Sequence, residues 1–259
     1  NLVDMNAFLF YKNKIAGTIP NEIGNLDKLT WIDMEDNQIV GTIPQSFYSN
    51  LDLEEVIFKN NTLSGTISDR VGDLSKLATF WASFNQLSGE IPTTFGECLN
   101  LEELELQNND LTGSIPEEFG NMESAEFLSI ESNQLTGSIP PRIFGQNIPG
   151  LRILYLNDNQ LSGPVPENYG QSPRLKDLWM NDNVLTGTLP IIAEGEFLFL
   201  EELLLNNNEM TGEVDESLCL IRNDTAPGGN LGVFHADCQP PTGGGAPQLV
   251  CSCCTACFV

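Results

Sequence analysis

The chain has 259 residues, of which 41% are hydrophobic, and its 36 acidic and 11 basic residues give a formal net charge of -25. This excess of negative charge excludes binding of nucleic acid or of anionic membranes as the function of this chain, because phosphate recognition needs a positive surface. The sequence has no run of about 20 apolar residues, so we expect no segment inserted in a membrane.

The dominant feature of the sequence is an asparagine that recurs together with a glycine four residues later. The asparagines are Asn13, Asn37, Asn61, Asn85, Asn109, Asn133, Asn159, Asn183 and Asn208. Consecutive asparagines are 24 residues apart in five successive steps, and the remaining steps are 26, 24 and 25 residues. In seven of the nine repeats a proline lies three residues after the glycine. Because the pattern already runs through the first ten residues, we expect processing or truncation upstream of Asn1.

Each repeat predicts one short strand, a turn and an outer segment. Leu101, Leu104 and Leu106 precede Asn109 by eight, five and three residues, and the last two have the spacing of a strand with one buried face. We expect the asparagine to bond backbone groups of adjacent turns, the glycine to permit the turn, and the proline to stiffen the outer segment. A single repeat cannot bury its own apolar residues, so the repeats must stack.

These residues resemble the plant-type leucine-rich-repeat family, whose repeat reads LxxLxLxxNxLxGxIPxxLGxL, over about residues 2–219. The resemblance implies a repeat solenoid of the α/β class, a curved right-handed superhelix whose mostly short parallel strands line the concave face. We predict about nine 24-residue repeats in residues 1–219 and a disulfide-rich C-terminal cap in residues 220–259. The paired-cysteine cap that plant members carry before the first repeat is not found in this sequence.

Two repeats contain extra residues between the proline and the next strand, within residues 144–150 and 191–199. We expect both segments to bulge from the convex or lateral side. One interpretation is a tolerated loop insertion, and the other is a loop that contacts a partner.

Six of the seven cysteines cluster near the C-terminus: Cys219, Cys238, Cys251, Cys253, Cys254 and Cys257. An even number of cysteines at a solenoid end predicts disulfides that close the last repeat, and sequence alone does not choose their pairing. Zinc is the alternative, but its ligands more usually come as two spaced pairs in a reducing compartment. This segment resembles the tails of diatom leucine-rich-repeat proteins. Cys98 lies at a core position, where we expect a buried, unreactive thiol.

The outward positions of the predicted strands carry aromatic and acidic side chains. The aromatic candidates for ligand binding on the concave face are Trp31, Trp81, Phe84, Phe127, Tyr155 and Trp179. The acidic candidates are Asp33, Glu35, Glu105, Glu131, Asp177 and Asp182. Aromatic residues also favour strands for structural reasons and would then only cover the sheet. Since tryptophans exposed on a concave face have no core to fill, we interpret them as anchors for a basic protein or peptide, or for a glycan.

The sequence predicts a protein that is not an enzyme and needs no cofactor. His235 is the only histidine, and no Ser/His/Asp or Cys/His set has a catalytic spacing. Two sequons, at Asn60 and Asn223, together with the cysteine cluster, predict a glycosylated extracellular protein, either secreted or at the cell surface. The predicted function is protein recognition or cell adhesion, as in the ectodomain of a receptor-like protein.

A structural or surface-binding role is the alternative function. The residue after the repeat glycine is often a threonine or serine, such as Thr18, Thr42 and Thr66, and stacked turns would space these side chains about 4.8 Å apart. Such a row could bind ice or a glycan lattice, but Glu90 and Pro164 interrupt it. Assembly of an extracellular matrix, by homotypic contacts or by calcium that bridges acids, is another form of this alternative.

Overall fold

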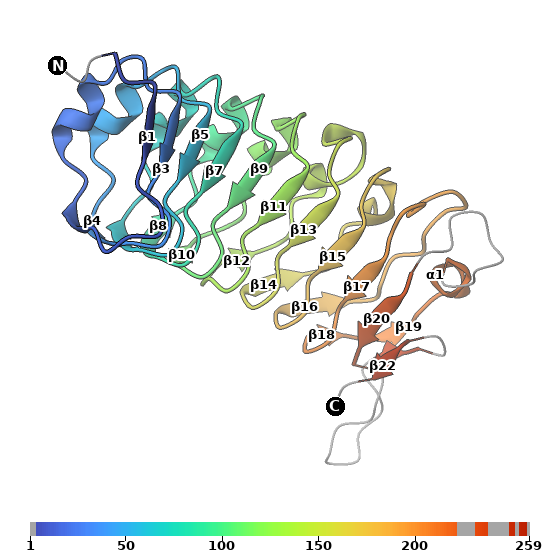
Figure 1. Ribbon diagram of the computed structural model, residues 1–259. Coiled ribbons are helices and arrows are strands. Elements are labelled where there is room, and N and C mark those ends of the chain that lie inside the picture. Colours follow the sequence, from blue (N-terminus) through green and yellow to red (C-terminus); the bar gives the residue numbers. More distant parts are fainter. Residues whose placement is uncertain (1–3, 222–230, 238–248, 252–253, 258–259) are drawn as a thin grey trace.

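The computed structural model describes residues 4–221, 231–237, 249–251 and 254–257, with only the backbone described for Ala256 and Cys257. Within these residues the chain forms a curved solenoid in which one turn follows another from the N-terminal to the C-terminal end (Figure 1). A typical turn contains a strand on one side, a second short strand beyond the recurring asparagine, and a 3₁₀ helix opposite the first strand. The predicted repeat solenoid is confirmed.

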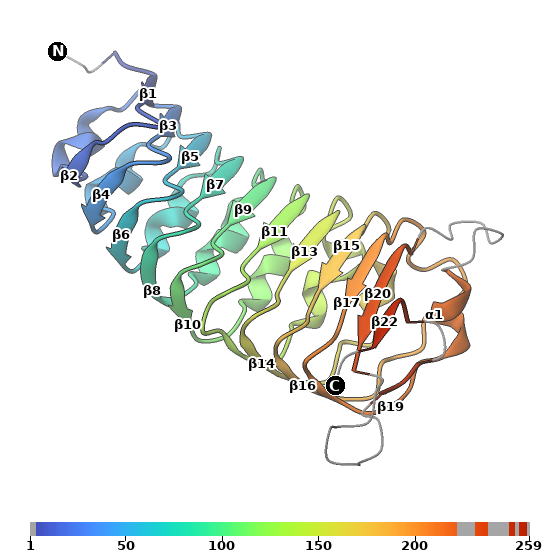
Figure 2. The ribbon, with the colours of Figure 1, turned by 60° about the horizontal axis from the view of Figure 1, so that its bottom comes forward.

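One parallel sheet runs the length of the described chain (Figure 2). Its strands, in spatial order, are β1 (Ala7–Leu9), β3 (Trp31–Asp33), β5 (Glu55–Ile57), β7 (Thr79–Trp81), β9 (Glu103–Glu105), β11 (Phe127–Ser129), β13 (Ile153–Tyr155), β15 (Asp177–Trp179), β17 (Glu202–Leu204), β20 (Val233–Ala236) and β22 (Ala256–Cys257). Trp31 pairs with Ala7 on one side and with Glu55 on the other, and this register continues along the sheet. Strands are the most closely spaced part of each turn, about 4.8 Å apart, so the solenoid is concave on this side.

The residues that follow the asparagines form shorter parallel sheets along a lateral face. One sheet contains β2 (Ala16–Thr18), β4 (Gln38–Gly41), β6 (Thr62–Gly65), β8 (Gln86–Glu90) and β10 (Asp110–Thr112), a second contains β12 (Thr136–Gly137), β14 (Gln160–Gly163), β16 (Val184–Gly187) and β18 (Glu209–Met210), and β19 (Gly212–Glu213) pairs with β21 (Leu249–Val250). The repeat glycines have positive φ, for example 79° at Gly113. Because other residues rarely adopt this conformation, glycine recurs in every repeat.

Short 3₁₀ helices cover the side opposite the long sheet: Asn21–Asn25, Gln45–Ser49, Asp69–Asp73, Thr93–Glu97, Glu117–Asn121, Pro141–Ile143, Gly145–Asn147 and Tyr169–Gln171. A proline precedes most of them, at an N-cap position with extended backbone such as φ -74° and ψ 150° at Pro20, which its fixed φ favours. One short α-helix, α1 (Glu216–Leu220), follows Asp215, whose carboxylate accepts a hydrogen bond from the Ser217 amide at 2.8 Å. In the part of the chain that the structure describes, no helix has the length and apolar character needed to cross a membrane.

The interior is filled by apolar side chains that face inward from every side of the turn. Leu101, Leu104 and Leu106 are fully buried, as their spacing predicts, and Phe119 is buried on the helical side. Cys98 is a free, fully buried thiol, and burial raises its pKa to about 12. The structure therefore agrees with the predicted core positions, including the buried Cys98.

The recurring asparagine joins consecutive turns through its side-chain amide. The Asn109 side-chain oxygen accepts a hydrogen bond from the Leu87 amide of the preceding turn at 2.9 Å. Its nitrogen donates to the Ala82 carbonyl of that turn at 3.0 Å and to the Leu106 carbonyl of its own turn at 3.0 Å. The equivalent asparagines repeat this pattern. These bonds satisfy backbone groups that lie inside the stack, so the predicted role of the asparagine is confirmed.

The two insertions lie on the convex side, as expected, and they also contribute to the core. In the first, the 3₁₀ helix Gly145–Asn147 lies on the helical side, and both Phe144 and Ile148 are fully buried. In the second, Phe197 is buried, and its ring packs edge-on against Tyr169 with the ring centroids 5.0 Å apart. The physical reason is that large apolar side chains in an inserted loop lower the free energy most when they leave water.

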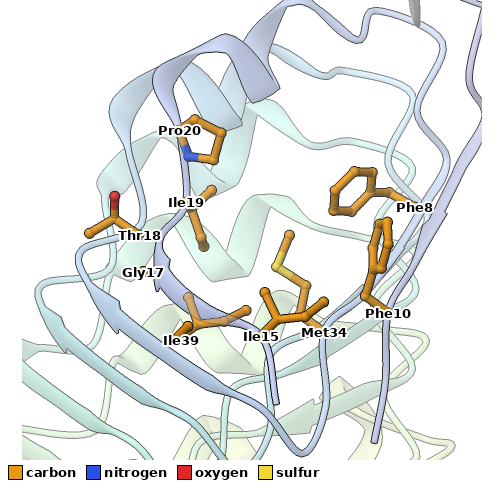
Figure 3. Close-up of a pocket in the computed structure, with 10 residues that line it drawn as sticks. Phe8, Phe10, Ile15, Gly17, Thr18, Ile19, Pro20, Met34 and Ile39 are labelled. Carbon is orange, nitrogen blue, oxygen red and sulfur yellow. The ribbon is translucent and has the colours of Figure 1, made fainter. Parts of the chain in front are cut away.

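At the first turn an apolar recess opens beside the core (Figure 3). Phe8, Phe10, Ile15, Ile19 and Met34 are among the residues that line it. The rings of Phe8 and Phe10 lie against each other with their centroids 4.5 Å apart. In the described chain the first turn packs against the second turn alone, so part of its apolar interior lacks the cover that inner turns receive.

The long sheet continues from the repeats into the predicted cap. Strand β20 pairs in parallel with β17, and β22 pairs with β20. Strand pairing therefore crosses from residues 1–219 to residues 220–259 without a break.

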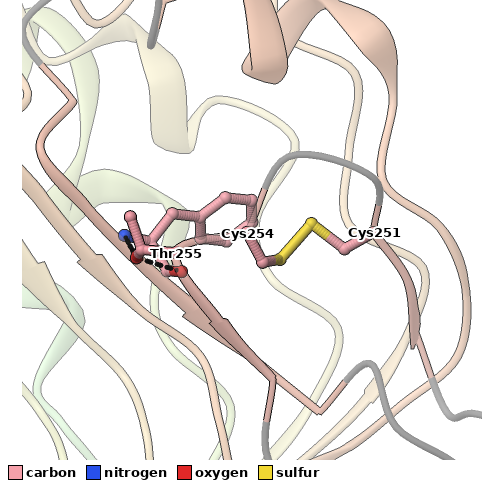
Figure 4. Close-up of a disulfide and its surroundings, with 4 residues drawn as sticks. Cys251, Cys254 and Thr255 are labelled. Atoms are coloured by element: carbon pink, nitrogen blue, oxygen red, sulfur yellow. Dashed lines mark hydrogen bonds between the residues drawn. A yellow bond between two sulfur atoms is a disulfide. The ribbon is translucent and has the colours of Figure 1, made fainter.

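Three of the six clustered cysteines are disulfide-bonded in the described part of the chain. One bond joins Cys251 and Cys254 (Figure 4), and Cys219 is also in a disulfide. Beside the first bond, the Phe234 amide donates a hydrogen bond to Thr255 Oγ1 at 2.6 Å, which links this segment to β20. The remaining members of the cluster lie outside the described residues: Cys238, Cys253 and the side chain of Cys257.

Replacing Asn109 with alanine tests the bonds between turns. We expect the free energy of unfolding to fall by about 3 kcal/mol, because the buried groups of Leu87 and Ala82 lose their partner. Asn13 is the matched control, since it is exposed and its amide bonds carbonyls of its own turn. Asn13→Ala should cost less than about 1 kcal/mol. Denaturant unfolding followed by circular dichroism measures both, and equal losses would contradict the role given to the inter-turn bonds.

Candidate functional site

The strand register arranges the outward side chains of the concave face in two rows. The first row contains the first residue of each strand: Ala7, Trp31, Glu55, Thr79, Glu103, Phe127, Ile153, Asp177, Glu202 and Val233. The second row contains the third residue: Leu9, Asp33, Ile57, Trp81, Glu105, Ser129, Tyr155, Trp179, Leu204 and His235. The predicted residues Glu35, Phe84, Glu131 and Asp182 lie in the turns just after the strands.

The predicted aromatic anchors lie at separate places along this face. Trp31 is on β3 and Trp81 is on β7, whereas Phe127, Tyr155 and Trp179 occupy the neighbouring strands β11, β13 and β15. Six strand steps separate Trp31 from Trp179, which corresponds to about 29 Å. A ligand that touches all of them must therefore be extended.

Lys59, Trp81 and Glu105 form the central cluster of the face. Lys59 Nζ lies 2.9 Å from Glu105 Oε2 and 5.6 Å from the centroid of the Trp81 ring. Ser83 Oγ and Gln107 Nε2 donate to the same carboxylate oxygen at 3.0 Å and 3.2 Å. Glu105 occupies the outward row, as predicted, but its side chain is only 9% exposed rather than open to solvent. The ion pair and two hydrogen bonds hold its carboxylate against the sheet.

The other predicted acids differ in how far they reach into solvent. Asp33 is also buried, because its carboxylate turns back to accept a hydrogen bond from the Glu35 amide at 3.0 Å. Glu131 is half-buried and accepts a hydrogen bond from Ser129 Oγ at 2.6 Å. Burial raises the pKa of Glu131, and this hydrogen bond lowers it. Asp182 is exposed, so it remains a candidate for attraction of a basic partner.

Phe127, Tyr155 and Trp179 form the aromatic cluster. The rings of Tyr155 and Trp179 are stacked, with centroids 4.1 Å apart and an interplanar angle of 25°. Phe127 meets Tyr155 edge-on at 5.9 Å. Trp179 Nε1 donates a hydrogen bond to Glu202 Oε2 at 3.1 Å. The sequence marks the three aromatic residues and Glu202 as outward residues, but not the link between Trp179 and Glu202, which depends on the pairing of β15 with β17.

Carboxylates create a negative field around the aromatic cluster. Burial raises the pKa of Asp177, and the charges of Glu202 and Glu201 raise it further. Burial, together with the charges of Asp177 and Glu202, raises the pKa of Tyr155 to about 12. A positively charged group is therefore favoured at this end of the concave face.

Most cations of the described chain already have acidic partners. The ion pairs are Lys28–Asp4, Lys59–Glu105, Arg70–Asp73, Lys76–Asp52, Arg152–Glu126 and Lys176–Glu201. With 36 acidic residues against 11 basic ones, these pairs leave a large surplus of negative charge. The surface as a whole favours cationic partners.

The residue before each recurring asparagine has a left-handed backbone conformation, which sequence reasoning missed. These residues are Lys12, Asp36, Asn60, Phe84, Asn108, Ser132, Asp158, Asp182 and Asn207. Asparagine and aspartate adopt this conformation most readily among non-glycine residues. Lys12, Ser132 and Phe84 depart from this preference. Phe84 is the one aromatic residue among the nine, and it combines a φ of 55° with a ring that is 45% exposed. A strained, exposed aromatic residue beside a concave face is typical of a binding position.

One predicted glycosylation site can be placed. Asn60 is exposed at the edge of the concave face, where its Nδ2 donates to Asp36 Oδ1 at 2.8 Å. Asn223 lies outside the described residues. Among the residues that the structure describes, no group of three or more histidine, cysteine, aspartate or glutamate side chains could hold a metal ion.

Comparisons with known proteins agree with the architecture. The sequence model of the Leucine Rich Repeat family matches residues 28–50, 100–122 and 150–171. No curated protein sequence matches the chain.

Several solved structures share the fold. A chain of the PEPR1–AtPEP1 complex has 30% sequence identity and a TM-score of 0.82, over 89% of this chain and 31% of that one. The Arabidopsis receptor kinase HAESA, in complex with the peptide hormone IDA and the co-receptor SERK1, has 26% identity and a TM-score of 0.81, over 93% and 43%. A plant ice-binding protein has 27% identity and a TM-score of 0.73, over 96% and 81%. This chain thus spans less than half the length of the matched chain in each of the first two structures.

Exchanging Phe84 for asparagine tests whether an aromatic residue in the left-handed conformation destabilises the fold. We expect Phe84→Asn to raise the free energy of unfolding by about 1 kcal/mol, because asparagine adopts the left-handed conformation more readily and no exposed ring remains. The reverse exchange at the equivalent position, Asn108→Phe, should lower stability by a similar amount. Denaturant midpoints at an unchanged slope measure both changes. A loss of stability in Phe84→Asn would show that the ring supports the fold.

Proposed function

Because this chain is a leucine-rich-repeat protein of the plant type, we propose that it is an extracellular recognition module whose concave face binds an extended peptide or protein segment. The observation that carries the proposal is the row arrangement of the face, which exposes aromatic rings at intervals along one direction. The span of about 29 Å between Trp31 and Trp179 matches about nine residues of extended chain.

The aromatic side chains and the carboxylates have different tasks in this proposal. Trp179, Tyr155 and Phe127 are half-buried rings that bury further area when a ligand covers them, so they supply affinity. Exposed acids such as Asp182 attract a basic partner over a longer range and mainly speed association. Trp31, Trp81 and Phe84 add contacts for an extended ligand, and Lys59 limits how closely it approaches Trp81.

The similar structures support a peptide or protein partner. Among them are the plant peptide hormone receptor RGFR1 in complex with RGF2, and the receptor kinase HAESA in complex with the peptide hormone IDA and the co-receptor SERK1. The chain covers 34% and 43% of these two receptor chains. We therefore propose the same class of partner, and with it an extracellular or cell-surface location as part of a receptor-like protein. Disulfides in the described cap fit this oxidising environment.

Peptide selection against the immobilised protein tests the proposed function. We expect a display library of random peptides about ten residues long to yield binders rich in arginine or lysine. Trp179→Ala should raise their dissociation rate about 30-fold or more, since an interface anchor is worth about 2 kcal/mol or more. Asp182→Asn, which suits the left-handed backbone, should slow association most at low salt.

The control variant lies on the opposite side of the solenoid. Ile191 is 70% exposed in the second insertion, and Ile191→Ala should leave peptide binding unchanged. Binders that tolerate Trp179→Ala and Asp182→Asn but are lost in Ile191→Ala would place recognition on the insertions and refute the proposal.

A surface-binding function is the second candidate, and similarity to a plant ice-binding protein over 81% of its length favours it. The lateral face also has an ordered row, because the methyl groups of Thr42 and Thr66 lie directly against Gly65 and Gly89 of the next turn. This packing restricts the threonine rotamers and gives their hydroxyls a regular spacing. If this candidate holds, the protein slows ice growth and Thr42→Lys weakens the effect. Unaltered ice growth at high protein concentration would exclude ice binding.

A further inference from the structure

Two places on the concave face combine a tryptophan with carboxylates, and they differ in the cation beside them. In the central cluster, Lys59 supplies an ammonium group that contacts both Trp81 and Glu105. Beside the aromatic cluster, no lysine or arginine of the described chain forms an ion pair with Asp177 or Glu202. In the central cluster, a tryptophan and a carboxylate of this face thus hold a cationic side chain of the protein itself.

The carboxylates beside the aromatic cluster are held in defined positions. Asp177 and Glu202 are register partners on β15 and β17, so their backbones are about 4.8 Å apart. Trp179 Nε1 donates to Glu202 Oε2 at 3.1 Å, and the ring of Trp179 stacks on Tyr155 with the centroids 4.1 Å apart. The indole donor uses only part of the accepting capacity of Glu202, since an ionised carboxylate has about four lone-pair sites.

The cation nearest in sequence does not neutralise this pair. Lys176 Nζ lies 2.7 Å from Glu201 Oε1, so its ammonium group is directed to the carboxylate that precedes Glu202. The pKa of Asp177 stays raised by burial and by the charges of Glu202 and Glu201, although Lys176 lowers it. The same carboxylate charges that raise this pKa attract a cation from a partner.

We infer that Asp177, Glu202 and Trp179 form a subsite for the guanidinium group of one arginine in the bound segment. The inference rests on the proposed function, because the arginine belongs to the peptide or protein that lies along the concave face. It deepens that proposal by naming one side chain of the ligand and the strands, β15 and β17, that receive it.

Arginine fits this geometry better than lysine does. A guanidinium group has five N–H donors in a planar fork, so it can bond two neighbouring carboxylates at once, whereas an ammonium group acts as a point charge. Its plane also packs on aromatic rings such as the Tyr155–Trp179 stack. Leu204 follows Trp179 in the second row and offers an apolar surface for the arginine methylenes.

Fluorine NMR of the intact chain tests the subsite directly. The protein has three tryptophans, so 5-fluorotryptophan labelling gives three signals, which Trp31→Phe and Trp81→Phe assign. The probe is N-acetyl-arginine methylamide, and its neutral isostere N-acetyl-citrulline methylamide is the matched ligand control. We expect arginine to shift the Trp179 signal with saturation near about millimolar concentration, and citrulline to leave it in place. N-acetyl-lysine methylamide should bind more weakly than the arginine probe.

Isosteric variants identify the carboxylates. Asp177→Asn and Glu202→Gln should each weaken arginine binding about tenfold, because each removes one charge-assisted hydrogen bond. Glu55→Gln is the matched control, since Glu55 lies in the same row and is also half-buried, but on β5, five strands from β15. Unchanged Trp31 and Trp81 signals in Asp177→Asn and Glu202→Gln show that the fold is intact. For Glu55→Gln the Trp81 and Trp179 signals serve this purpose, because Glu55 is the strand partner of Trp31.

Three results would overturn the inference: a Trp179 signal that ignores arginine, an equal response to citrulline, or full binding in Asp177→Asn. A stronger response to calcium than to arginine would also overturn it, because the carboxylates would then be a metal site. The proposed function fails separately. If selected peptides bind the concave face but tolerate Asp177→Asn, the inference is wrong and the proposed function stands. If the arginine probe binds but selection yields no peptide, the proposed function is refuted instead.

Discussion

The asparagine side chain that bridges consecutive turns is the interaction on which the rest of the structure depends. Each of these amides accepts from the turn before it and donates to carbonyls of both turns, so neighbouring turns can pair in one alignment only. The amide lies inside the stack, where an unpaired backbone group would be costly, and this cost makes the alignment strict. The unbroken strand register of the long sheet follows from this constraint.

Because the strand register is constant, side chains one repeat apart in the sequence lie next to one another in rows on the concave face. Tyr155 and Trp179 are one repeat apart in the chain, yet their rings stack at 4.1 Å. Lys59 reaches across two strands to Glu105, which is 46 residues away in sequence. The concave face is therefore divided along its length: its centre is neutralised by the chain's own lysine, and the end near β15 and β17 remains acidic and aromatic. This division makes the second region the more open to a ligand.

The repeat itself could be predicted from the sequence because it depends on local chemistry. The glycine marks a backbone conformation that other residues avoid, and the proline marks the start of the outer 3₁₀ turn. The burial of Leu101, Leu104 and Leu106 follows from their spacing, and the position of the outward aromatic residues follows from the same period. These features need no knowledge of which side chains meet across the stack.

Contacts across the stack were decided by the tertiary structure alone. The sequence marks Glu105 and Asp33 as outward residues, but rotamers and neighbours bury them, because hydrogen-bond donors lie within reach only after folding. The insertion that carries Phe197 reads as a surface loop, yet the space beside Tyr169 draws its ring inward. The link between Trp179 and Glu202 likewise depends on strand pairing. The repeat period and the residue type determine which face of a strand a side chain leaves from. The residue that it contacts depends on distances between strands, which exist only in the folded chain.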